Sequence, residues 1–344
     1  MARISHRIYL CVATVLVLLA VRLAFAPRDV ASSVPMGGAT YAAAVADANA
    51  QVAAVHARLA HLKVSSWMEL KRASNVFMSR GRLCDNWKDY ATGDSLMARA
   101  FDIAPAGTGP FLGRARLNFT MHRFDKVEGD LARAQSQMLL SPRTQSEIEA
   151  LRADAALERG EFDAALAHYQ SAVAAERNFD NLARLAGGLA KTGSLEAADR
   201  TYVEAAAALP RSATRERAWV SLQRGLVALQ AKDLDRALSH YRDARKMFPG
   251  WWLADEHIAE ALALQGHDDR ALVIYQDVLA RTGDPEFMDA LARIYRHRGD
   301  EATASKWIEL AKEGHAKRLA RFPEAAAGHA KQHIKDFGPI TGGA

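Results

Sequence analysis

The chain repeats a segment of about fifteen residues. "GEFDAALAHYQSAVA", residues 160–174, returns with changes as "GSLEAADRTYVEAAA", "KDLDRALSHYRDARK" and "GHDDRALVIYQDVLA". Their aromatic positions, followed by an isoleucine, are Tyr169, Tyr202, Tyr241, Tyr275 and Ile308, at spacings of 33, 39, 34 and 33 residues. A period of about 20 to 50 residues is typical of repeat arrays, whose units bury their apolar faces only by stacking on one another. The repetition therefore predicts an elongated array of similar units.

Small residues flank each aromatic position. Four residues before it stand Ala165, Ala198, Ala237, Ala271 and Ala304, and three residues after it stand Ala172, Ala205, Ala244, Val278 and Ala311. Two fainter copies precede these, centred on Met97 and Leu131. Small side chains let two helix axes approach closely, and a tyrosine fills the space that they leave. We therefore expect these positions to pack within and between helix pairs.

The small-x3-aromatic-x2-small pattern, with a Gly/Asp turn before it, resembles the tetratricopeptide repeat (TPR) family. The resemblance implies an all-α fold, an α-solenoid of about seven helix–turn–helix repeats over residues 74–318. A capping helix at 319–336 and a frayed tail at 337–344 would follow. Frequent alanine and the lack of paired Val/Ile/Thr-rich runs agree with helices. The extra residues of "RSATRE", before Trp219, are expected to lengthen one junction without breaking the array.

The same resemblance implies a groove, lined by the first helix of each repeat, that holds a protein or peptide partner. The residues at the expected positions are Asn75, Arg82 and Asn86 in the first copy, Trp219, Leu222 and Leu226 in the fifth, Glu256 and Glu260 in the sixth, and Asp289, Arg293 and Arg296 in the seventh. Such a groove would be apolar, then acidic, then basic, which suits an extended or helical peptide with a hydrophobic anchor. Ordinary helix packing is the alternative role for each of these residues.

The N-terminus predicts a membrane segment. A basic stretch at 1–7 precedes an apolar run at 8–25, whose 18 residues would span roughly 27 Å as a helix, close to the thickness of a bilayer core. A cleaved secretory signal is the alternative, although Pro27 follows the best cleavage point. A slight positive bias before the run favours a bacterial inner-membrane protein with its bulk in the periplasm. With cleavage, the protein would be periplasmic.

Residues 26–40 are rich in Pro, Gly and Ser and are typical of a flexible linker. A long helix is expected over 41–72. Its larger apolar residues, together with Ala48, follow a 4-3-4-3 rhythm: Tyr41, Val45, Ala48, Val52, Val55, Leu59 and Leu62. This seam has two interpretations: a short coiled coil through 41–62 that forms a homo-oligomer, or a helix laid along the first repeat.

No motif indicates catalysis, and no catalytic residue, cofactor or metal is expected. His329 and His333 stand four apart, a spacing that suits zinc on a helix. However, Ala330 occupies the position where a zinc metalloprotease has glutamate, so a structural or solvent-exposed pair is expected. "GGLAKTG" lacks the glycine that precedes lysine in a phosphate-binding loop. The chain contains neither S-x-x-K nor G-x-S-x-G.

The net charge of +5 comes from the C-terminal end. Between Arg293 and Lys335, ten Lys or Arg face five Asp or Glu. An anionic surface or nucleic acid is therefore an alternative partner for this end. Few aromatic residues interleave with these charges, and export would separate the protein from nucleic acid. Hence no nucleic-acid partner is expected. The other interpretation is that these mixed charges are ordinary solvent-exposed residues on the helix faces.

Overall fold

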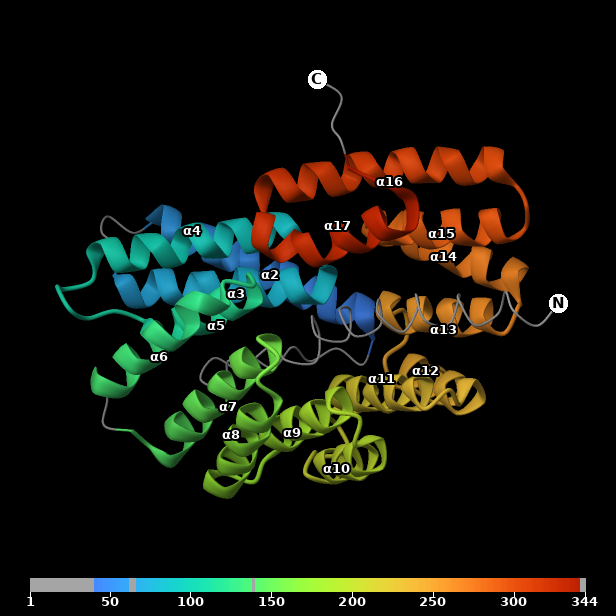
Figure 1. Ribbon diagram of the computed structural model, residues 1–344. Coiled ribbons are helices and arrows are strands. Elements are labelled where there is room, and N and C mark those ends of the chain that lie inside the picture. Colours follow the sequence, from blue (N-terminus) through green and yellow to red (C-terminus); the bar gives the residue numbers. More distant parts are fainter. Residues whose placement is uncertain (1–39, 62–65, 138–139, 341–344) are drawn as a thin grey trace. The chain divides into compact units, whose positions relative to one another are not determined.

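The computed structural model describes residues 40–61, 66–137 and 140–340. Every helix or strand assigned within these ranges is an α-helix (Figure 1). The described residues form two compact units: the N-terminal unit ends at Glu216 and the C-terminal unit begins at Arg217. Among these helices, none combines the length and apolar character that a membrane crossing requires. The basic segment at 1–7, the predicted membrane segment at 8–25 and nearly all of the linker lie outside the described residues.

The helices follow one another with short connections. In the N-terminal unit they are α2 (Tyr41–His61), α3 (Trp67–Cys84), α4 (Trp87–Ile103), α5 (Phe111–Thr120), α6 (Phe124–Gln137), α7 (Pro142–Glu158), α8 (Phe162–Ala175), α9 (Phe179–Lys191) and α10 (Leu195–Ala207). The C-terminal unit contains most of α11 (Thr214–Gln230), then α12 (Leu234–Met247), α13 (Trp252–Leu264), α14 (Asp268–Thr282), α15 (Pro285–His297), α16 (Glu301–Arg321) and α17 (Pro323–Phe337). From α3 to α16, each odd-numbered helix and its successor form one repeat.

The repeated small and aromatic residues form contacts both inside these pairs and between one pair and the next. The four tyrosines of the pattern are at most 5 % exposed, and the alanines four residues before them are fully buried. Tyr169 lies so close to Gly188 of α9 that a Cβ on that glycine would stand 2.8 Å from the ring. Tyr241 of α12 packs on Gly225 of α11 in the same manner. Glycine thus provides the surface on which the ring rests, and close packing follows.

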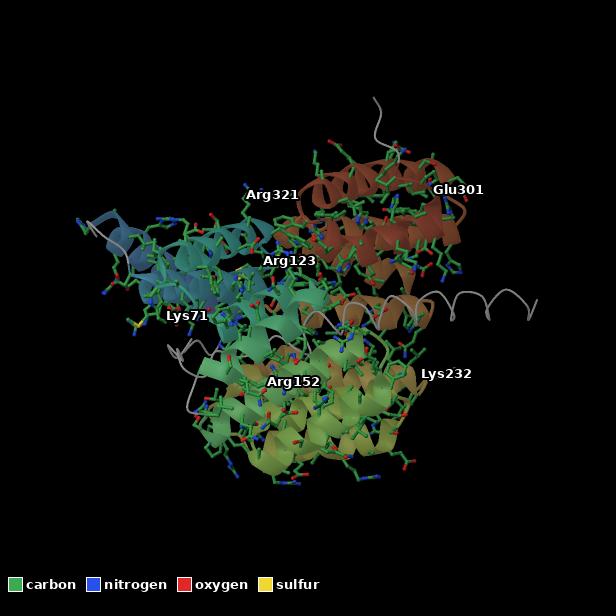
Figure 2. All side chains as sticks on the ribbon, turned by 60° about the vertical axis from the view of Figure 1, so that its left-hand side comes forward. Lys71, Arg123, Arg152, Lys232, Glu301 and Arg321 are labelled. Atoms are coloured by element: carbon green, nitrogen blue, oxygen red, sulfur yellow. The ribbon has the colours of Figure 1, made fainter. Side chains whose placement is uncertain are left out.

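One left-handed residue stands in the turn between the two helices of each repeat. These residues are Asp85, His122, Gly160, Gly193, Lys232, Gly266 and Gly299. At this turn the chain reverses direction, so the second helix runs antiparallel to the first. Backbone N–H groups just after the turn residue bond to the last carbonyls of the first helix; the N–H of Asp233, for example, donates to Ala228 O at 2.9 Å. Four of the seven positions hold glycine, which adopts this conformation without steric cost. Lys232 does not have that freedom, and its side chain points into solvent (Figure 2).

The helix expected over 41–72 is divided in two. Helix α2 ends at His61, and α3 begins at Trp67 after a capping box in which Ser66 accepts from Glu69 N and the Glu69 side chain reaches back to Ser66 N. The first repeat therefore starts at Trp67, earlier than the expected Ser74. The serine side chain satisfies a backbone donor that a continuous helix would have bonded internally, which is why a new helix starts there.

The apolar seam of α2 packs on the first repeat. Ala44, Ala48 and Val52 are buried, and Val52 belongs to a core with Leu70, Phe77 and other residues of α3 and α4. Tyr41 donates a hydrogen bond to Leu83 O at 3.3 Å. The seam is thus covered within the chain, as the second interpretation expected. The suggested homo-oligomer through 41–62 would have to displace these contacts.

The C-terminal boundary also differs from expectation. Helix α16 continues to Arg321, and a new helix, α17, runs from Pro323 to Phe337, where a single capping helix was expected over 319–336. Glu301 and Arg321 mark the two ends of α16 in Figure 2. Proline fits the first turn of α17, where its missing N–H costs nothing, but it cannot continue α16.

The division between the two units falls close to "RSATRE". Residues 210–213 form a turn after α10, and α11 then begins at Thr214. The extra residues were expected to leave the array unbroken. They stand next to the boundary at which the described residues separate into two compact units, so this expectation stays a prediction.

Candidate functional site

Four residues predicted to line the groove lie around one cavity of the C-terminal unit. Glu256 and Glu260 come from α13, and Asp289 and Arg293 come from α15. The cavity has a volume of about 50 Å³. A single water needs about 10–15 Å³ on this measure, so the cavity has room for a few waters or one ion with its water, but not for a peptide side chain of any size.

Helix α17 forms the third wall of this cavity. Gly328, His329 and Gln332 face it. Helix α17 packs on α16 and also touches α15, just as α9 packs on α8 and touches α7. In the C-terminal unit α17 thus takes the place of one more first helix (Figure 1). The chain's own helix therefore covers this part of the predicted groove.

A histidine lies between the two glutamates of α13. Nδ1 of His257 is 3.1 Å from Glu256 Oε2 and 3.2 Å from Glu260 Oε2, and all three residues are buried. One N–H can donate well to only one acceptor: the hydrogen bond is made to Glu260, and Glu256 Oε2 accepts none. Burial raises the pKa of Glu256 to about 8, an effect that His257 opposes and Glu260 reinforces. Burial lowers the pKa of His257, but the two glutamates outweigh it, so this pKa is raised.

Asp289 accepts hydrogen bonds from two further histidines. Nε2 of His315, on α16, lies 2.8 Å from Oδ2, and Nδ1 of His333, on α17, lies 2.7 Å from Oδ1. Burial alone would raise the pKa of the Asp289 carboxyl, but these two hydrogen bonds outweigh it and hold the pKa below its usual range. Asp289 is thus bonded to both helices that follow α15.

The pair His329 and His333 occupies the inner face of α17. Both are buried, His329 against Glu286 of α15 and His333 against Asp289. A solvent-exposed pair, one of the two expected roles, is therefore wrong. Asp289 and His315 are remote from His333 in sequence, so no short spacing marks the three residues as a group. Folding brings these three residues together as a group that can ligate a metal.

Arg293 and Arg296 are engaged by the end of α17. Arg293 pairs with Asp336 at 3.0 Å. Arg296 donates to Asp336 O and lies over the ring of Phe337. The basic end of the predicted groove therefore makes contacts within the chain, although Arg296 remains exposed.

The other predicted groove residues are scattered. On α11, Leu222 is only 1 % exposed, which leaves it unavailable to a partner, whereas Trp219 and Leu226 are half-buried. In the N-terminal unit, Asn75 and Arg82 are half-buried on α3. Asn86 caps α4 by accepting from Lys88 N, so its side chain has a structural role.

Ion pairs tie the first helices of the N-terminal unit together. Arg116 of α5 pairs with Glu147 of α7. Lys191 of α9 pairs with Glu158 of α7 at 2.9 Å. Asp154 of α7 is buried 3.5 Å from Arg184 of α9. These contacts link side chains of consecutive first helices, a network that the repeat pattern alone did not reveal.

Most of the basic excess at the C-terminal end is neutralised locally. Six of the ten cations between Arg293 and Lys335 pair with carboxylates of the same unit: Arg293, Arg296, Arg298, Lys312, Lys317 and Arg318. A surface that recruits phosphates needs cations without such partners. These ion pairs favour the interpretation that the charges solvate helix faces.

Neither a protein-family model nor a curated protein matches the chain. Similar solved structures include pilF of Pseudomonas aeruginosa, with a TM-score of 0.46 and 19 % identity, covering 64 % of this chain and 96 % of that chain. A tetratricopeptide repeat protein from Parabacteroides merdae has a TM-score of 0.49 and 16 % identity, covering 78 % of this chain and 98 % of that one. A TPR protein from Thermus thermophilus has a TM-score of 0.43 and 21 % identity, covering 54 % of this chain and 96 % of that one.

Proposed function

We propose that this protein is a non-enzymatic scaffold that binds a protein partner along the first helices of its TPR-like repeats. The observation that carries the proposal is the row of first helices in the N-terminal unit, where α3 contacts α5, α5 contacts α7 and α7 contacts α9. A row of this kind presents one continuous surface built from successive repeats, which solenoid proteins use for binding. A partner segment in extended or helical form suits such a surface.

Each unit has half-buried residues of its own on its first helices. In the N-terminal unit Asn75 and Arg82 are half-buried on α3, and in the C-terminal unit the apolar Leu226 is half-buried on α11. Leu222 and the acidic residues around the α13–α15–α17 cavity are excluded from this proposal, because they are buried within the chain. The partner is therefore a protein segment with a hydrophobic side chain that packs near Leu226.

We further propose that residues 8–25 anchor the scaffold in the bacterial inner membrane and that the repeats face the periplasm, where they assemble envelope proteins. The length and apolar character of this segment support an anchor. The alternative is a periplasmic protein released by signal cleavage. Two measurements distinguish the anchor from the cleaved signal: N-terminal sequencing of the protein isolated from cells, and carbonate extraction of the membranes. An intact Met1 region in the carbonate-resistant fraction supports the anchor, and a new N-terminus near Pro27 contradicts it.

In-cell photocrosslinking tests the binding surface. One variant carries a photoreactive amino acid in place of Asn75, on the first helix α3 of the N-terminal unit. The matched control carries it in place of Val203, an exposed apolar residue on the second helix α10 of the same unit. We expect a discrete crosslinked protein from the Asn75 position only. Equal crosslinking at both positions, or none at Asn75, would contradict binding along the first helices.

A further inference from the structure

Two histidines and an aspartate from three helices converge in the C-terminal unit. Asp289 lies on α15, His315 on α16 and His333 on α17. The three potential ligand atoms all lie within 4.8 Å of one another. The rings of His315 and His333 are 5.1 Å apart, inclined at 50°. Their nitrogens therefore approach the carboxylate from two different directions, as ligands do around a common centre.

This triad is almost completely shielded from water. His315 and His333 are 1 % exposed and Asp289 is 4 % exposed. The ring of Phe337 lies 5.5 Å from that of His333, and Arg293, one helical turn from Asp289, is held by Asp336. The side chains around the triad are thus fixed by their own contacts, which is what a preorganised metal site needs.

The cavity beside the triad is rich in negative charge. Its lining includes four carboxylates, those of Glu256, Glu260, Glu286 and Asp289. Against them stand His329 and Arg293, and the arginine is already paired with Asp336. Glu256 Oε2 accepts no hydrogen bond. Burying carboxyl groups is costly unless cations or protons compensate them. His257 lies between Glu256 and Glu260, and a divalent cation at Asp289 would add positive charge on the other side of the cavity.

We propose that Asp289, His315 and His333 bind a zinc ion, with water from the adjacent cavity as the fourth ligand. Two imidazole nitrogens and one carboxylate oxygen, with a fourth position left to water, form a common tetrahedral zinc set. Calcium and magnesium instead prefer oxygen ligands alone. The cavity of about 50 Å³ borders Asp289 and has room for that water.

Zinc requires only a small adjustment of the triad. Metal–ligand distances of about 2.0–2.2 Å in a tetrahedron place ligand atoms roughly 3.3–3.5 Å apart. His333 contacts Oδ1 of Asp289 at 2.7 Å and His315 contacts Oδ2 at 2.8 Å, so each contact would open by about half an ångström and the carboxylate would turn to present one oxygen to the ion. The hydrogen that each histidine shares with Asp289 must leave the coordinating nitrogen, and in a neutral imidazole it moves to the other ring nitrogen.

The site would fasten α17 to the last repeat, because its ligands come from α15, α16 and α17. Without metal, the hydrogen bonds to Asp289 join the same helices more weakly. Bound zinc would stabilise the folded unit in proportion to its occupancy. This role is independent of partner binding along the first helices of the N-terminal unit, so failure of either proposal leaves the other standing.

The test uses the full chain, purified without a polyhistidine tag and stripped with a chelator. Zinc chloride is titrated by calorimetry into this protein and into three variants, His315→Asn, His333→Asn and His297→Asn. His297 is the control, a solvent-exposed histidine of α15 bonded to Asp268. We expect one zinc per wild-type chain, a loss of affinity of about tenfold or more in the first two variants, and unchanged binding in the control.

X-ray absorption of the zinc-loaded wild type counts the imidazole ligands directly, so the proposal stays testable even if a variant fails to fold. Two imidazoles are expected. Failure of the wild type to bind zinc would overturn the proposal, as would one or no imidazole ligand. Zinc uptake that survives both triad variants but is lost in Glu260→Gln would also overturn it, because the ion would then belong to the carboxylates of α13.

Discussion

Tyr169 donates a buried hydrogen bond of 2.8 Å to Asp154 Oδ1, whereas Tyr241, at the same position two repeats later, has no hydrogen-bond partner for its hydroxyl. Both side chains are fully buried. The repeat pattern thus keeps the ring but not its polar partner. The two tyrosines have the same place in the fold and different energetic roles.

Substitution of these tyrosines by phenylalanine should therefore have different effects. Tyr169→Phe removes a hydrogen bond to a buried carboxyl and should lower the free energy of unfolding by about 1–3 kcal/mol. Tyr241→Phe removes a hydroxyl that lacks a partner and should be neutral or slightly stabilising. Urea unfolding of both variants measures the difference. Equal losses would show that the hydrogen bond to Asp154 does not distinguish the two hydroxyls energetically.

Asp154 should make the stability of the N-terminal unit depend on pH. Burial raises its pKa to about 7 from 3.8, although Arg184 and the hydroxyl of Tyr169 oppose the shift and Glu158 adds to it. A carboxyl whose folded pKa is raised stabilises the fold fully below its unfolded pKa and loses that contribution as pH rises through the folded value. The free energy of opening around α7 and α9 should fall by up to about 4 kcal/mol between about pH 4 and 8.

Hydrogen exchange of α7 and α9 in wild type and Asp154→Asn measures this dependence. In Asp154→Asn, the free energy of opening around α7 and α9 should no longer show the decrease with rising pH that Asp154 causes. Asp163→Asn on the exposed face of α8 serves as control and should keep it. An identical pH dependence in Asp154→Asn and wild type would show that Asp154 does not cause it.

Replacement of Lys232 by glycine should stabilise the folded protein. It holds φ at 65° in a turn where four other repeats place glycine. A side chain costs about 1 kcal/mol in this conformation, partly offset by the greater freedom of glycine in the unfolded chain. Lys232→Gly should therefore raise the free energy of unfolding by about 0.5–1 kcal/mol, and Gly266→Ala should lower it by a similar amount. Thermal and urea unfolding measure the stability of both variants. A lower free energy of unfolding in Lys232→Gly would show that the backbone of Lys232 is not strained.

Alanine substitution of two neighbouring basic residues of α16, Arg318 and Lys317, should lower the free energy of unfolding by very different amounts. Arg318 lies 2.9 Å from the buried carboxylate of Asp284, which also caps α15 by accepting from Glu286 N. Arg318→Ala breaks this buried pair and should cost about 3 kcal/mol or more. Lys317 forms a solvent-exposed ion pair with Glu313, so Lys317→Ala should lower the free energy of unfolding by less than about 0.5 kcal/mol. The midpoint of urea unfolding compares them, and similar midpoints would contradict the assigned burial.

The repeat architecture was readable from the sequence because one contact recurs. Tyrosine on a small surface needs the same residue types each time, so the spacing survives even where Ile308 replaces the aromatic side chain. The boundary at Ser66 was missed, although "SWME" carries the Ser-x-x-Glu pattern of a capping box. The long apolar rhythm before it masked this local signal.

The site was only partly readable. The repeat register found Glu256, Glu260, Asp289 and Arg293, which indeed face one cavity. It could not find His315, because this residue lies in a late turn of α16 and no short spacing links it to Asp289 or His333. Nor could it show that Leu222 is buried or that α17 covers Arg293. These facts depend on how helices stack, which the period of a repeat does not specify.

The position of α17 also bears on how such a chain grows. A repeat array lengthens by duplication of a helix pair, and a new pair at the C-terminal end needs the bare side of α15 and α16 as its docking surface. Helix α17 already occupies that side. An added pair would therefore have to displace α17 or pack on its outer face, and a second copy of the chain would have to do the same to join end to end there.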